Sequence, residues 1–187
     1  MIDPTSIGGA LASRLTPTPV AFPAVHCGNC GAVEVPQRQY RSAPLAPDPT
    51  YDTGDVIVFS KAGGCGVPIV DAAEYRLSDL LGGDDLMFVN TTVSTFSVRI
   101  EWPGYKMWNG QFRAKSWGGT NEPITRSRLA LQIAKRVIEF LEAMEGVETE
   151  DMAWKVGRGH IVASDLVLVS LAQVSKGSWQ PLLRLLA

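Results

Sequence analysis

The sequence contains few of the side chains on which most catalytic and metal sites depend. Its 187 residues include only two histidines and three cysteines, and charged residues make up 19% of the chain. Nineteen acidic against seventeen basic residues leave a formal charge of −2, so the chain as a whole has no strong attraction for nucleic acid or an anionic membrane. No apolar run reaches the length of a membrane span, and we therefore expect no membrane segment.

We also expect no secretion signal and no disulfide framework. The N-terminal residues have no early basic cluster, and Pro17, Pro19 and Pro23 interrupt their apolar stretches. The odd number of cysteines argues against a scaffold held together by disulfides. We therefore expect a protein of a reducing compartment, the cytoplasm or the nucleus.

Proline divides the chain into two parts. Eight of the twelve prolines precede Thr50, which predicts an extended N-terminal arm over residues 1–50. The remaining residues, 51–187, are long enough for one sizeable core and too short for two independent ones. We expect them to form a single domain.

Periodicity predicts the elements of that domain. Apolar side chains recur at spacings of three and four over 125–145, which predicts a long helix capped by Thr125 and ended by Gly146. A short helix is expected over 71–81, with Asp71 as its N-cap. Strands are expected at 55–60, 86–89, 92–102, 165–174 and 182–186. The pattern predicts an α+β fold, in which a curved, mostly antiparallel sheet packs against one long helix.

Five short motifs follow one another in the second half of the chain. They are Trp102–Tyr105 (WPGY), Pro123–Arg126 (PITR), Trp154–Gly157 (WKVG), Asp165–Val169 (DLVLV) and Gly177–Pro181 (GSWQP). In this order they resemble a group of uncharacterised proteins from mushroom-forming (basidiomycete) fungi, over residues 98–187. The resemblance implies a related fold and a fungal, intracellular context. It implies no activity and no catalytic residue.

The cysteines suggest a zinc site. Cys27 and Cys30 have the spacing of a zinc knuckle, but Ala62 stands where a second pair would need a partner for Cys65. A histidine would complete the site, and His26 is less suitable because it adjoins Cys27. The candidate ligands are Cys27, Cys30, Cys65 and His160. The alternatives are free buried thiols or a local disulfide between the first two cysteines, and zinc is the one cofactor that the sequence suggests.

Cys65 also has the outline of a nucleophile, because it lies between glycines after an expected strand. A cysteine-dependent enzyme would need a histidine base, such as His160. Neither histidine comes with a recognisable partner motif, and glycines around a cysteine often mark a tight turn. The pattern therefore favours a protein that is not an enzyme.

Residues 102–117 concentrate aromatic and basic side chains. The candidate binding residues are Trp102, Tyr105, Lys106, Trp108, Arg113, Lys115 and Trp117. Such a surface can stack on rings or prolines while its cations contact anionic groups, although the same aromatics can also pack in the core. The first hypothesis is a non-enzymatic domain that binds another protein or self-associates through this surface and the N-terminal arm. A zinc module that contacts nucleic acid is the alternative.

Overall fold

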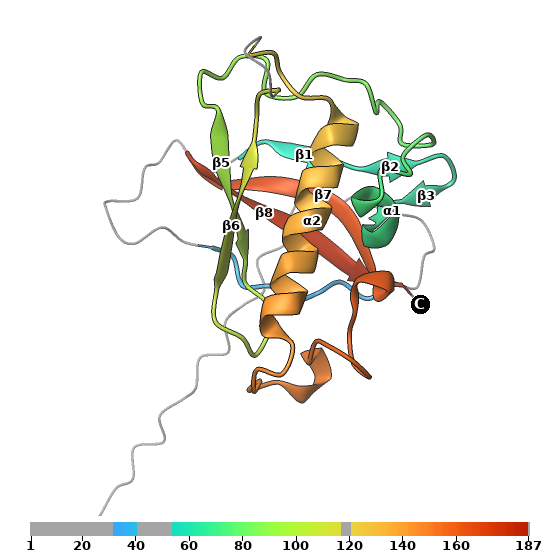
Figure 1. Cartoon of the computed structure of the whole chain (residues 1–187), viewed down its shortest axis with the longest axis vertical. Coiled ribbons are helices and arrows are strands. Elements are labelled where there is room, and N and C mark those ends of the chain that lie inside the picture. The colour runs from blue at the N-terminus through green and yellow to red at the C-terminus, as the bar shows by residue number, and fades with distance from the viewer. Residues whose placement is uncertain (1–31, 41–53, 117–120, 187) are drawn as a thin grey trace, which may run out of the picture.

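The structure, a computed structural model, describes residues 32–40, 54–116 and 121–186. Its main sheet has six strands, and one long helix lies across the face that Figure 1 turns toward the viewer. The path of the sheet is β1 (Val56–Val58), β7 (Leu166–Ser175), β8 (Ser178–Leu185), β5 (Thr95–Ile100) and β6 (Trp108–Arg113), while β4 (Val67–Pro68) pairs with the other half of β7. All pairs are antiparallel except β5 with β8. The expected α+β fold is confirmed.

The long helix forms where its periodicity predicts it. α2 spans Arg126–Met144, and the side chain of Thr125 caps it by accepting a hydrogen bond from the backbone nitrogen of Arg128 at 3.2 Å. Gly146 follows the helix with a φ of 77°, a conformation that suits glycine after a helix. The buried face of α2 contributes the core residues Leu129, Ala130, Ile133, Ala134, Val137, Phe140 and Leu141.

The segment before α2 differs from its prediction. The short helix α1 spans Ile69–Ala73 rather than 71–81, so Asp71 lies inside it. Residues 86–89 do not form a strand: Leu86 makes one bridge to Thr125, and Phe88 has a φ of 61°. A positive φ is unusual for a bulky residue and breaks the regular extension of a strand. Beside α1, β2 (Ser60–Lys61) and β3 (Gly64–Cys65) form a separate two-stranded sheet, and two short 3₁₀ helices span Met152–Trp154 and Ala163–Asp165.

A strap, defined here as residues 32–40, lies beside β8 and is drawn in blue in Figure 1. The backbone nitrogen of Val35 donates to Leu183 O, and that of Leu185 donates to Val33 O, both over short distances of 2.9 and 2.8 Å. The first half of β8 pairs with β5 instead, at Ser178 and Trp179. The strap therefore pairs with the same edge of β8 beyond the point where the pairing with β5 ends.

Two buried glutamines hold the strap beyond this pairing. Gln37 donates from Nε2 to Pro181 O at 2.7 Å and accepts at Oε1 from the backbone nitrogen of Glu101 at 3.1 Å. Gln180, fully buried, donates to Arg38 O at 2.8 Å and accepts from the backbone nitrogen of Tyr40 at 3.0 Å. Each amide thus satisfies one backbone donor and one backbone acceptor, as a neighbouring strand would.

Candidate binding groove

The predicted aromatic surface is largely internal. Trp102 and Tyr105 are buried, and their polar atoms bond within the fold: Trp102 Nε1 donates to Trp154 O at 2.7 Å, and Tyr105 Oη accepts from the backbone nitrogen of Val156 at 3.1 Å. Trp108 is half-buried, with its ring 6.2 Å from that of Phe140. The expectation of exposed rings at Trp102 and Tyr105 is therefore wrong, because α2 and residues 152–156 use them as core.

The basic residues of that surface separate from one another. Lys106 and Arg113 are exposed, whereas Lys115 is buried with its ammonium 3.4 Å from Phe88 O. The side-chain amide of Gln132 makes two hydrogen bonds to the backbone of Arg113: it accepts from the nitrogen and donates to the oxygen. Trp117 lies outside the described residues. The described part of this segment thus forms strand β6 and its flanks, and no continuous aromatic–basic face.

The zinc hypothesis falls mostly on residues that the structure does not describe. Cys27 and Cys30 lie outside the described ranges, and of Cys65 only the backbone, in β3, is described. His160 is exposed in the turn between Gly157 and Ile161. Among the described residues, no three histidine, cysteine, aspartate or glutamate side chains gather as a metal site would require. The zinc hypothesis stays a prediction.

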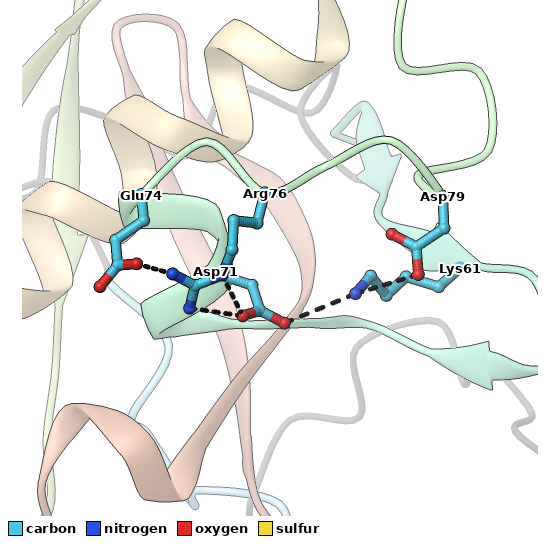
Figure 2. A network of polar contacts seen from close by, with 5 residues as sticks. All are labelled: Lys61, Asp71, Glu74, Arg76 and Asp79. Atoms are coloured by element: carbon cyan, nitrogen blue, oxygen red, sulfur yellow. Dashed lines mark hydrogen bonds and ion pairs between the residues drawn. The ribbon is translucent and has the colours of Figure 1, made fainter.

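The densest charged cluster is a clamp around α1 (Figure 2). Asp71 lies between Arg76, whose guanidinium donates to Oδ1 at 2.8 Å, and Lys61, whose ammonium is 3.5 Å from Oδ2. Lys61 also pairs with Asp79 at 3.1 Å, and Arg76 also pairs with Glu74. The hydrogen bond from Arg76 is the largest cause that lowers the pKa of Asp71. Because each carboxylate already has a cationic partner, the cluster ties β2 to α1 and the turn that follows it.

A groove of about 730 Å³ begins at β1 and is lined also by residues of β7, β8 and β5. One wall is formed by Asp55, Val56 and Ile57, and the opposite wall by residues 86–93, which belong to the green segment at the top of Figure 1. Lys176 in the turn between β7 and β8, together with Gln173 of β7 and Trp179 of β8, also lines the groove. The groove therefore lies between an edge strand and an irregular segment rich in apolar residues.

Phe88 belongs to a cluster of four aromatic rings, three of which (Phe88, Phe96 and Trp179) line the groove. The Phe88 ring lies 5.2 Å from that of Phe96, 5.8 Å from that of Phe112 and 5.3 Å from that of Trp179. Phe88 reaches this cluster from a backbone with positive φ, which carries strain for a bulky residue. In the same groove, the apolar side chains of Leu86, Val89 and Val93 are about half exposed, at 54, 54 and 42%. Together they form an apolar rim that water covers in the isolated chain.

Trp179 carries an unsatisfied donor beside the groove. The side chain is 3% exposed, and its buried Nε1 has no hydrogen-bond partner among the described residues. A buried indole nitrogen ordinarily has a partner, as Trp102 does here. Leaving such a donor unpaired costs about 1–3 kcal/mol. The unsatisfied indole is therefore a feature of this region that the fold itself does not explain.

The wall formed by β1 is an open strand edge. The bonds from Phe59 N to Val169 O and from Gln173 N to Asp55 O show that odd-numbered residues of this stretch face β7. Since hydrogen-bonded positions alternate along an antiparallel pair, the backbone groups of Val56 and Val58 face outward. Val58 O accepts from Arg126 Nη1 at 2.8 Å, whereas no described residue bonds to the outward N–H and C=O of Val56.

Arg126 limits the open edge on one side. Its guanidinium contacts Val58 O, Gly82 O at 3.2 Å and Asp85 Oδ2 at 3.1 Å, so it joins β1, the turn after α1 and the start of α2. All three nitrogens of the guanidinium are thereby used. Lys176, in contrast, is exposed on the rim and makes no ion pair with a described carboxylate. It is the cation of this groove that remains available for a ligand.

Comparison of the chain with protein-family models, with curated proteins and with solved structures found no match. Among the described residues, no helix is both long and apolar enough to cross a membrane. The evidence for the candidate site is therefore its geometry alone. The sequence does not predict this site, because its residues come from four separate segments of the chain.

Proposed function

We propose that the protein is a non-enzymatic binding domain whose groove beside β1 holds an apolar segment of another protein. The observation that carries this proposal is a groove with an exposed apolar rim, beside which the buried Trp179 has an unpaired Nε1. A bound segment would cover Leu86, Val89 and Val93 and so remove the unfavourable exposure of these side chains to water.

The chemistry of the lining favours binding over catalysis. Among the described residues that line the groove, the ionisable side chains are Asp55, Arg126 and Lys176. Each nitrogen of the Arg126 guanidinium already donates one hydrogen bond within the fold. No nucleophile is paired with a base in this set, as general acid–base or covalent catalysis would require. We keep the expectation that this binding takes place in the cytoplasm or the nucleus.

A random peptide library displayed on phage tests the proposal. Peptides are selected on the wild-type protein, synthesised, and measured against Val93→Asp, which places a charge on the apolar rim. We expect the affinity to fall by at least about tenfold, because a carboxylate resists burial against apolar side chains. Val147→Asp is the matched control, since Val147 is 44% exposed against 42% for Val93 and does not line the groove. Equal loss in both variants, or in neither, contradicts the proposal.

A further inference from the structure

We infer that the partner segment is an extended peptide that pairs through its main chain with the open edge of β1 at Val56. This inference rests on the proposed function and specifies its ligand class: a strand-forming, apolar peptide with an acidic residue. The carrying observation is that Val56 lines the groove and that its outward N–H and C=O have no partner among the described residues. Exposed strand edges of this kind are the sites at which peptides add to sheets.

The groove fixes where such a strand can lie. A peptide residue opposite Val56 would donate to its carbonyl and accept from its amide, as β7 does for the neighbouring Ile57. Beyond Val56 the edge is closed, because Arg126 occupies Val58 O and Leu81 N donates to Ser60 O at 2.8 Å. The open stretch is therefore short, and a peptide would make few main-chain bonds. Its remaining affinity must come from side chains.

Side chains that alternate along an extended peptide suit the remaining walls. One set would face Phe88, Phe96 and the rim valines, which calls for apolar residues. Arg126 and Lys176 outnumber Asp55 in the lining, and the ammonium of Lys176 has no described carboxylate partner. An acidic peptide residue would therefore find a complementary charge where Lys176 lines the groove.

The second open edge of the sheet provides a matched comparison. On β6, Ala114 N donates to Ser94 O, so by the same alternation the backbone groups of Asn109 and Gln111 face away from β5. Both residues are exposed, but none of the residues that line the β1 groove comes from this strand. This edge has outward backbone groups without the apolar groove. A peptide that needs both features would choose β1.

Proline substitutions test whether the peptide binds to the edge of β1 or to the edge of β6. Val56→Pro removes the outward N–H and leaves the bonds between β1 and β7 in place, since the amide of this residue does not take part in them. Asn109→Pro makes the same change on β6. With the peptides selected on the wild-type protein, we expect Val56→Pro to weaken binding by about tenfold and Asn109→Pro to leave it unchanged. Hydrogen exchange in the wild-type protein should show the Val56 amide protected when the peptide is added.

The outcomes distinguish this inference from the proposed function. Peptide binding that is lost in Val93→Asp but kept in Val56→Pro, with no protection of the Val56 amide, overturns strand addition and leaves the groove as a binding site. Loss in Asn109→Pro alone places the peptide on β6 and also overturns the inference. A dimer that forms without peptide and dissociates in Val56→Pro shows that a second copy of the chain occupies the edge, which overturns it too. Exchange protection alone decides the matter if Val56→Pro does not fold.

Discussion

The backbone groups on both outer edges of the β7–β8 hairpin need neighbouring strands or side chains as hydrogen-bond partners, and the two edges differ in how completely the described chain provides them. On the flank of β8, the strap and the amide of Gln37 bond to backbone groups of β8 that β5 leaves unpaired, and the amide of Gln180 bonds to the strap. On the flank of β7, the short strand β1 pairs inward but leaves Val56 open, and Trp179 keeps an unpaired donor nearby. One flank is closed by the chain itself, and the other leaves polar groups unpaired.

Under the proposed function, this difference separates the flank that serves stability from the flank that serves binding. Each unsatisfied buried donor lowers stability by about 1–3 kcal/mol, which is a sizeable part of the 5–15 kcal/mol that holds a domain together. Gln37, which bonds to Pro181 O of β8, shows that a glutamine side chain can satisfy an exposed strand edge in this very sheet. The absence of such a side chain at Val56, among the described residues, is what a site for an external strand requires.

The closed flank should be the more sensitive to substitution. Gln180→Ala leaves Arg38 O and Tyr40 N without their partner and opens a cavity in a fully buried position. We expect the free energy of unfolding to fall by about 2–4 kcal/mol, measured by urea denaturation. Gln39→Ala is the control in the same strap, because Gln39 is exposed, and it should change stability by less than about 0.5 kcal/mol. A loss at position 180 no larger than the control contradicts the role given to the strap.

A pair of tryptophan substitutions sharpens the comparison. Trp102 and Trp179 are both buried, but only the first donates its Nε1, to Trp154 O. Trp102→Phe leaves that carbonyl without its donor, whereas Trp179→Phe removes a nitrogen that has no partner among the described residues. We expect Trp102→Phe to lower the free energy of unfolding by about 1–3 kcal/mol more than Trp179→Phe in the same urea titration. Equal losses would mean that the Trp179 nitrogen is satisfied in solution.

The sequence predicts the elements whose pattern is local. Regular spacing of apolar residues and the cap at Thr125 locate α2 to within a residue or two, and the Val/Leu-rich run locates β7. The pattern does not single out β6: Trp108 and Phe112 alternate with exposed polar residues, but the mixture of rings and cations is also typical of a binding surface. Gly110 completes the pattern: a Cβ there would lie 2.6 Å from the Trp108 ring, so the helix-facing side of the strand needs a glycine.

The candidate site could not be predicted from the sequence in the same way. That Val56 lies on an open edge depends on the strand order, and that Trp179 lacks a partner depends on everything packed around it. Apolar residues 86–89 predict a strand by composition, yet they form a groove rim because Phe88 takes a positive φ to reach the aromatic cluster. These are tertiary properties, and a pattern along one segment does not contain them.

Substitution of Glu101, beside the strap, should give the smallest change in the free energy of unfolding. Unlike the other substitutions, it should stabilise the protein. Burial is the largest influence on its carboxyl and raises its pKa, while Arg38, 3.7 Å away, and Arg99 oppose the shift. A folded pKa above the unfolded value of about 4.3 means that the ionised form destabilises the folded chain, and that this penalty disappears as the pH falls below the unfolded value. Glu101→Gln keeps the backbone bonds to the strap and should raise the free energy of unfolding at pH 7 by less than about 1 kcal/mol. Urea titrations of both proteins should converge near pH 4 and below, and a less stable variant at pH 7 would show that the pair with Arg38 outweighs burial.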